Sequence, residues 1–168
     1  EIKISKEELI QEEKTIVVLT SDGYLKRVSP KSYNKDEETG LKPGDVVLNL
    51  YNASTLDKLL IITDLGNYLY IPVHDISEAK WKEMGKHISN LVTVNPDEKV
   101  INSFIVNDRT KNNVLLLFTE NGMIKKSKLE DYAVMRFNKA MGAIKLKVGD
   151  KVVSASIENE LVMMCSCD

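Results

Sequence analysis

One hairpin, written several times along the chain, constrains the fold of this sequence more than any other feature. Residues 15–27 read TIVVLTSDGYLKR. Two β-rich runs joined by an Asp-Gly turn are the strongest short-range signal for a β-hairpin. Gly23 accepts the positive φ that such a turn requires and that other residues resist. The segment therefore predicts two antiparallel strands joined by a tight turn at residues 20–23.

The hairpin recurs at residues 58–72 and 113–127, with the turn sequences TDLG and TENG. The turn threonines Thr20, Thr63 and Thr119 lie 43 and then 56 residues apart. Residues 161–168 resemble the first strand of a fourth copy. Self-similarity at a period of roughly 40–50 residues is typical of propellers and repeat arrays, in which each unit is one small sheet.

Two further landmarks recur in the same order. The sequence KPGDVV at 42–47 matches KVGDKVV at 147–153 and, more weakly, NPDEKV at 95–100, while KEMG at 82–85 matches KAMG at 139–142. Short strands at regular spacing predict an all-β array of small sheets. We expect a connector at 1–14, repeat units at 15–57, 58–112 and 113–157, and the first strand of a fourth unit at 158–168.

Some segments fall outside the repeat pattern. Ser5 and Glu8 form a capping-box pattern that predicts a short helix over residues 6–13. The polar residues 29–40 predict a mobile loop, residues 77–84 a single helical turn, and residues 91–94 and 100–106 strands. Trp81, the only tryptophan, is either a partly buried anchor or a surface on which a base or sugar stacks.

The net charge of −2 argues against a strongly basic nucleic-acid-binding protein. The distribution is nevertheless uneven, since residues 120–151 hold eight lysines and arginines against four acidic residues. A basic stripe on a mildly acidic domain is therefore compatible with the sequence. No apolar run approaches the roughly 20 residues of a membrane span, and no signal-peptide pattern opens the chain. We expect a soluble, intracellular protein.

The sequence offers no catalytic or metal-binding constellation. Cys165 and Cys167 lie two apart on an expected strand, where small apolar side chains are common. His74 and His87 fall in different segments without ligand spacing. Neither a phosphate-binding glycine loop nor a nucleophile elbow is present. We expect no metal, no cofactor and no catalytic activity in this segment.

Cations do recur at one repeat position. Lys26 and Arg27 follow the first turn glycine as Lys125 and Lys126 follow the third, whereas the second repeat has leucine and tyrosine there. Equivalent positions line one rim of an array, so such cations either neutralise phosphates or protect a sheet edge from aggregation. The sequence leaves both interpretations open. The residues expected on a DNA-binding rim are Lys26, Arg27, Lys31, Lys125, Lys126, Lys128, Arg136 and Lys139.

The ordered landmarks TIVVLTSDGYLKR, LKPGDVV, KLLIITDLGNYLYIPVHDI, KEMGKHISNLVTVNPDEKVI and VLLLFTENGMIKKSKLEDY resemble the C-terminal domain of the A subunit of bacterial type II topoisomerases. The resemblance covers residues 2–168. It implies a β-pinwheel, a propeller-like array of four-stranded blades that exchange strands and bend duplex DNA around a basic perimeter. Three repeats and one strand are too few for a closed disc of this kind, so we expect an open arc with an unpaired strand edge at 161–168.

Within that family, the loop of the first repeat separates two branches. DNA gyrase members carry a Gln-Arg-Arg-Gly-Gly-type box there, which wraps DNA with one handedness. Residues 33–40 read YNKDEETG, which retains the final glycine and has acids in place of the arginines. The resemblance therefore favours the topoisomerase IV branch and argues against a handed wrap. A gyrase-type wrapping domain and a propeller-like protein-interaction module are the alternatives.

The resemblance also implies partners and cofactors. The parent enzyme would pass one duplex through another, using ATP and Mg²⁺ on other domains and on an ATPase B subunit. Its catalytic tyrosine would lie outside this sequence, so none of the six tyrosines present is assigned that role. The implied partners are duplex DNA and, within the enzyme, the remainder of the A subunit together with the B subunit. The implied location is the cytoplasm, in association with the chromosome or at the inner face of the membrane.

Overall fold

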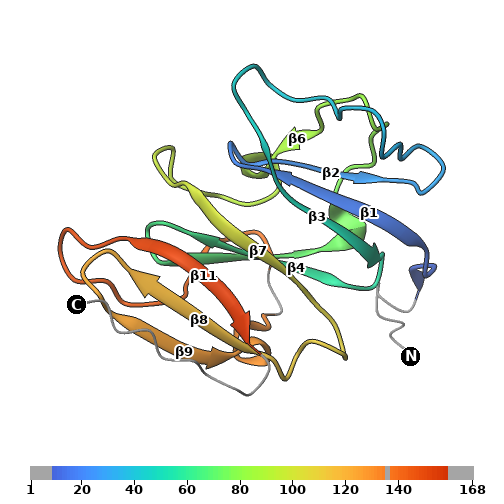
Figure 1. Ribbon diagram of the computed structural model, residues 1–168. Helices are drawn as coiled ribbons and strands as arrows, with labels where there is room; N and C mark the ends of the chain where they lie inside the picture. The colour runs from blue at the N-terminus through green and yellow to red at the C-terminus, as the bar shows by residue number, and fades with distance from the viewer. Residues whose placement is uncertain (1–8, 135–136, 159–168) are drawn as a thin grey trace.

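A computed structural model describes residues 9–134 and 137–158 of the protein (Figure 1). In this part of the chain three antiparallel sheets account for the regular structure, together with short 3₁₀ turns. These turns are η2 (Val73–Asp75), η3 (Ile88–Asn90) and η4 (Leu129–Tyr132). The prediction of an all-β fold is confirmed.

The first sheet has the strand order β3-β1-β2-β6. Its strands are β1 (Lys14–Thr20), β2 (Tyr24–Val28), β3 (Val47–Ser54) and β6 (Lys86–His87). The predicted hairpin is confirmed, because Leu19 of β1 pairs with Leu25 of β2. Gly23 closes the turn with a φ of 89°.

The second sheet has the order β10-β5-β4-β7 and the third the order β11-β8-β9. The second contains β4 (Lys58–Thr63), β5 (Asn67–Pro72), β7 (Val100–Val106) and β10 (Met141–Gly142). The third contains β8 (Val114–Thr119), β9 (Ile124–Lys128) and β11 (Val152–Glu158). Both sheets are built on the recurring hairpin.

The fourth strand of a sheet comes from the repeat that follows it in the sequence. Strand β6 lies between β5 and β7 in the chain but pairs with β2 of the first sheet. In the same way β10, which follows β9, pairs with β5 of the second sheet. We call residues 76–88 the first strap and residues 138–146 the second strap. Each strap carries the chain across the outer edge of the preceding sheet.

Burial of both faces of the central hairpin strands holds the sheets together. On β4, Leu59 and Ile61 belong to one apolar cluster with β1, while Leu60 and Ile62 belong to a second cluster with β8. Alternate residues of a strand point to opposite faces. The second sheet is therefore sandwiched between the first and the third, which explains why its hairpin reads as a continuous apolar run.

Strands β3, β7 and β11 lie side by side on the inner side of the arc (Figure 1). The Ser103 hydroxyl of β7 donates to Asn49 Oδ1 of β3 at 2.8 Å. On the other side of β7, Asn102 Nδ2 donates to the carbonyl of Ala155 at 2.9 Å. Because these strands are inner, the outer edges of the three hairpins belong to β2, β5 and β9.

Several local predictions are wrong. Of the helix expected at 6–13, Leu9 is in a 3₁₀ turn, residues 10–13 contain no helix, and residues 6–8 lie outside the described residues, as do residues 161–168. Residues 77–84 form no helix. Residues 77–79 run extended along β2, where Ala79 N donates to the carbonyl of Arg27 at 2.9 Å, and residues 80–83 form an isolated turn in which Glu83 N donates to the carbonyl of Lys80 at 3.0 Å. Residues 91–94 form no strand, and only Thr93 makes a bridge, to Lys139.

The loop at residues 29–40 is attached to the first strap rather than a free excursion. The indole of Trp81 donates to the carbonyl of Glu37 at 2.8 Å, and Gly40 N donates to the carbonyl of Trp81 at 3.2 Å. Tyr33 meets the Trp81 ring edge to face, with the ring centroids 4.8 Å apart. The loop therefore has specific partners that its polar composition did not reveal.

Candidate nucleic-acid interface

Lys26 does not project to an outer rim, contrary to expectation. Its side chain is 2% exposed. The ammonium donates to the carbonyl of Trp81 at 2.7 Å, and also to the carbonyl of Glu83 and the hydroxyl of Thr39. Burial lowers the pKa of Lys26, and the nearby carboxylate of Glu83 partly offsets that effect. An ammonium with these three acceptors is not available to a DNA phosphate.

The neighbouring cation and the tryptophan are also engaged by the first strap. Arg27 is half-buried, and its Nε donates to the carbonyl of Ile76 at 3.2 Å. Trp81 is buried against Ile16 and Val18 of β1. Of the two interpretations of Trp81, the structure supports the buried anchor, because a ring that is 7% exposed offers no platform for a nucleic-acid base.

The third sheet presents its cations differently. Lys125, Lys126 and Lys128 are all exposed on β9, the outer strand of this sheet. Lys125 Nζ donates to the carbonyl of Ala143 in the second strap at 2.6 Å. Lys128 Nζ lies 3.7 Å from Glu130 Oε1. Exposed ion pairs of this kind contribute little to the stability of the fold. Among the cations predicted to bind DNA, these three lysines form the largest exposed group on one strand.

The remaining predicted cations are dispersed. Lys139 is exposed at the start of the second strap, close in sequence to the carbonyl that holds Lys125. Lys31 is exposed on the loop after β2, in another sheet. Arg136 lies outside the described residues. Of the eight predicted residues, the structure therefore brings together Lys125, Lys126 and Lys128 on β9, while Lys139 makes a bridge to Thr93.

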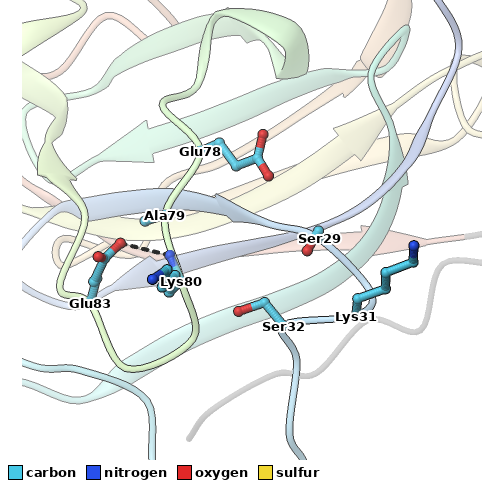
Figure 2. Close-up of a pocket in the computed structure, with 7 residues that line it drawn as sticks. All are labelled: Ser29, Lys31, Ser32, Glu78, Ala79, Lys80 and Glu83. Carbon is cyan, nitrogen blue, oxygen red and sulfur yellow. Dashed lines mark hydrogen bonds between the residues drawn. The ribbon is translucent and has the colours of Figure 1, made fainter.

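Lys31 borders a shallow hollow of 590 Å³ between its loop and the first strap (Figure 2). Lys80 also lines it, but so do Glu78 and Glu83. The Lys80 amide donates to Glu83 Oε2 at 2.7 Å, the contact dashed in Figure 2. Because its charges are of both signs, this hollow has no preference for an anion.

A larger hollow of 970 Å³ is lined by the first two sheets and by segments that flank the hairpin of the third, and it is equally mixed in charge. Its cationic and anionic lining residues are Lys14, Lys58, Arg109 and Lys111, and Glu12, Asp57, Asp108 and Glu130. Within the described residues no group of three or more histidines, cysteines and acids could hold a metal ion. No helix there is long and apolar enough to cross a membrane.

Two aspartates from the Gly-Asp landmark have a structural role that the sequence did not reveal. Asp45 Oδ1 accepts from the amides of Asp22 and Val46 at 3.0 and 2.8 Å. Asp150 Oδ1 accepts from the amides of Asn121 and Lys151 at 3.0 and 2.9 Å. Each carboxylate thus ties a hairpin turn to the strand start beside it. Burial raises the pKa of Asp150, but its hydrogen bonds and the charge of Lys147 outweigh that effect and lower the pKa overall.

Comparison with known proteins adds to this geometry. The chain is 38% identical over 161 residues to the A subunit of DNA topoisomerase 4 from Bacillus subtilis, which covers 95% of the chain and 20% of that protein. It is 42% identical over 156 residues to the A subunit of DNA topoisomerase 4 from Staphylococcus aureus, with coverages of 92% and 20%. The chain thus spans about a fifth of the length of these relatives.

Among solved structures, the crystal structure of the C-terminal domain of a DNA topoisomerase IV matches with a TM-score of 0.83 and 38% identity. The match covers 88% of this chain and 46% of that one. The family model described as the DNA gyrase C-terminal domain, beta-propeller, matches residues 14–35, 57–107 and 113–157. These segments contain the three hairpins and two of the three inner strands, β7 and β11. The chain therefore belongs to the DNA gyrase C-terminal domain, beta-propeller family.

Proposed function

We propose that the chain is a non-catalytic domain that binds and bends duplex DNA as the C-terminal part of the A subunit of a type II topoisomerase, of the topoisomerase IV type. The observation that carries the proposal is the group of exposed lysines on the outer edge of the third sheet, on a fold shared with subunits of DNA topoisomerases. Lysines on a convex edge neutralise phosphates without reading base sequence.

The proposed contact residues are the exposed cations among those predicted from the sequence. Lys125, Lys126 and Lys128 lie on β9, Lys139 lies at the start of the second strap, and Lys31 lies apart on the loop after β2. Lys26 is excluded because it is buried and hydrogen-bonded. Arg27 is half-buried under the first strap, and we assign it a minor part.

The proposed role in the parent enzyme is to hold a flanking or transported duplex and so to influence which DNA crossings are used in decatenation and relaxation. We infer that ATP and Mg²⁺ act on other domains, that the ATPase B subunit is reached through the remainder of the A subunit, and that the enzyme works in the cytoplasm on the chromosome. Grafting this domain onto a tailless enzyme and comparing relaxation with decatenation tests that role.

The DNA proposal is tested by charge reversal on β9. In Lys126→Glu/Lys128→Glu, duplex affinity should fall about tenfold at 0.1 M salt and the slope of log K against log salt should shrink by about two, because two phosphate contacts are lost. The loss should be the same for unrelated DNA sequences. Fluorescence anisotropy with labelled 30-base-pair duplexes at several salt concentrations measures both quantities.

The matched control is Lys42→Glu/Lys99→Glu, which changes the net charge equally at two exposed turns that lead into inner strands. Affinity in this control should stay within about twofold of the parent, since Coulomb interactions beyond the Debye length of about 10 Å are screened. Equal losses in both double variants would show that binding is diffuse. Affinity that does not fall as salt is raised would favour a protein-interaction module instead.

A second candidate function, handed DNA wrapping of the gyrase type, is disfavoured by the loop at 33–40. Asp36, Glu37 and Glu38 are exposed there, and Glu37 pairs with Lys82 of the first strap at 3.1 Å. Exposed acids repel a phosphate backbone. A topology assay should therefore find no supercoils of one sign constrained by the domain.

A further inference from the structure

The segment that leads into β1 is attached to the linker between the first two sheets. We call residues 10–13 the entry segment and residues 55–57, between β3 and β4, the first linker. Glu13 N donates to Thr55 Oγ1 at 2.9 Å, and Thr55 N donates to the carbonyl of Glu13 at 3.0 Å. The Thr55 hydroxyl donates to the carbonyl of Gln11 at 2.9 Å. One threonine therefore makes three hydrogen bonds with the entry segment.

These bonds continue the pairing of β1 with β3 beyond the end of β3. The last residue pair of this ladder joins Lys14 to Ser54. After Ser54 the chain turns toward β4, and Asp57 N donates to the carbonyl of Ser54 at 3.0 Å. Because the backbone of β3 has ended, the Thr55 hydroxyl supplies the acceptor that the next strand carbonyl would otherwise provide. The side chain of Thr55 thus extends the attachment of the entry segment past the strand.

Hydrogen bonds, rather than apolar packing, hold the last three residues of the entry segment. Gln11, Glu12 and Glu13 are exposed, whereas Thr55 is 3% exposed. The Ser54 hydroxyl also donates to Glu12 Oε1 at 3.2 Å, but this contact is exposed, and water competes for such bonds. Removal of the Thr55 hydroxyl would therefore release these residues without opening a cavity in the core.

The linker between the second and third sheets uses its threonine differently. We call residues 107–113, between β7 and β8, the second linker. Thr110 Oγ1 accepts from Asn107 N at 3.0 Å and donates to the carbonyl of Ile105 at 2.8 Å. These partners are three and five residues away, whereas the partners of Thr55 are 42 and 44 residues away. Thr110 closes its own turn, and Thr55 joins two distant segments.

The first linker is also fixed to the second sheet. Val73 N, just after β5, donates to the carbonyl of Asp57 at 3.0 Å. The entry segment is therefore attached where two sheets meet. Strand β1 belongs to the first sheet and β9 to the third, at opposite ends of the arc (Figure 1). We propose that Thr55 is a positioning residue: it attaches the entry segment rigidly to the arc and so determines where a duplex bound at β9 lies relative to the part of the polypeptide that precedes β1.

This inference rests on the proposed function, in which the entry segment joins the domain to the remainder of the A subunit. Release of residues 10–13 would lengthen the flexible connection by up to about 14 Å, at 3.3–3.6 Å per residue. The domain would still bind DNA, because the lysines of β9 lie in another sheet. The bound duplex would sample more positions, so the choice of DNA crossings would change while the affinity for DNA would not.

The attachment is tested in the 168-residue chain without DNA. Thr55→Val removes the hydroxyl, and the Glu13 amide should then exchange with solvent roughly tenfold faster, as expected for the loss of one hydrogen bond. Thr55→Ser keeps the hydroxyl and should restore slow exchange. Thr110→Val is the matched control, since it removes a hydroxyl with two backbone partners from the second linker and should leave the Glu13 amide unchanged. NMR measures the exchange, and circular dichroism checks that the sheets are intact.

The positioning role is tested by grafting each variant onto a tailless enzyme. In Thr55→Val the ratio of the decatenation rate to the relaxation rate should change about threefold, because the effective concentration of a tethered group depends on the length of its tether. The ratio should return to the parent value in Thr55→Ser and stay there in Thr110→Val. Duplex affinity of the ungrafted Thr55→Val chain, measured by fluorescence anisotropy, should equal that of the parent.

Four results would overturn the proposal. Glu13 exchange in Thr55→Val equal to that of the parent would show that the hydroxyl does not hold the entry segment. Faster exchange with an unchanged rate ratio would show that the attachment does not position the duplex. An equal change of the ratio in Thr110→Val would trace the effect to lost stability, and a loss of duplex affinity in Thr55→Val would trace it to DNA binding.

Failure of the proposed function gives a different pattern. A parent chain that does not bind DNA would refute that function and the positioning role with it. Exchange of the Glu13 amide, which is measured without DNA, would still decide whether Thr55 holds the entry segment.

Discussion

The first and third sheets contain nearly the same hairpin but have different outer edges. Strand β2 lies beneath the first strap, and its lysine is buried with three acceptors. In the described residues no strap pairs with strand β9, and its Lys125 is exposed, with one carbonyl acceptor on Ala143 of the second strap. The environment of a side chain in this fold is thus set by a segment from the next repeat, 55 residues away in the case of Lys26 and Trp81, as well as by its own strand.

This difference changes how recurring cations are interpreted. Lys26 and Lys125 were expected to share one role on one rim. A lysine can bury its ammonium when backbone carbonyls replace the lost water, and Lys26 is such a case. Equivalent positions in two repeats therefore predict where a residue lies in its sheet. Whether its side chain is exposed depends on whether a strap covers that sheet edge.

The largest effect is expected when the apolar edge residues are truncated. Leu25→Ala should lower the free energy of unfolding by about 3 kcal/mol, because it leaves a cavity beneath the first strap. Ile124→Ala should change it by about 0.5 kcal/mol or less, as for other exposed positions. Urea unfolding followed by circular dichroism measures both. Similar losses at the two positions would mean that β9 is already covered in solution.

The buried lysine should show the next largest effect. Lys26→Met removes the donor of the Trp81 and Glu83 carbonyls and should cost about 2 kcal/mol, the range for buried polar groups left without partners. Lys125→Met is the matched control and should cost less than about 0.5 kcal/mol. If the free energy of unfolding of Lys26→Met equals that of the parent within error, the hydrogen bonds of the ammonium to the two carbonyls do not contribute to stability.

The close approach of the first strap is tested at a glycine. Gly85 has a φ of 82°, and a Cβ there would lie 2.8 Å from the carbonyl oxygen of Leu25. Gly149 has a φ of 81° with nothing within 4 Å. Gly149→Ala should therefore cost about 1 kcal/mol for the left-handed backbone alone. Gly85→Ala should cost about 1 kcal/mol more from the clash. Equal thermal shifts would contradict tight packing of the strap on β2.

The smallest effect concerns acid stability of the third sheet. The folded-state pKa of Asp150 is lowered, so its carboxylate stabilises the fold at pH values above the unfolded-state pKa of about 4. That contribution is lost as the pH falls through the unfolded-state and then the folded-state pKa. Asp150→Asn should flatten the decline of stability below about pH 4. Asp97→Asn, at an exposed turn, is the control, and an identical acid profile for the two variants would contradict this role.

The sequence predicted the hairpins because their signals are local. Gly23, Gly66 and Gly122 all adopt the positive φ expected of turn glycines, and the strands around them are rich in β-branched and aliphatic residues. The family also followed from the order of the landmarks. The resemblance implied that blades exchange strands, but the residues that form the straps were not predicted, since strands of two residues such as β6 and β10 carry no periodic pattern of their own.

The errors at the candidate site have the same origin. Strand alternation places Lys26 on a face of the sheet, but it does not show that Trp81 and Glu83 cover that face. Residues 77–84 were predicted to form a single helical turn, whereas pairing with β2 keeps residues 77–79 extended and only residues 80–83 turn. Long-range contacts overrode local preference in both places. The exposure of the lysines on β9 was predictable because, in the described residues, no distant strand pairs with the outer edge of β9.

The use of straps has a consequence for how the chain matures on the ribosome. The hairpin of the first sheet is complete at Val28, yet its outer strand ends at His87. At about 5–20 residues per second, synthesis of the intervening residues takes roughly 3–12 seconds. During that interval Leu25 and Lys26 are exposed to water and to neighbouring nascent chains. A chaperone that shields extended edges would thus have a defined period of action at each repeat, and ribosome pausing before residue 87 would lengthen it.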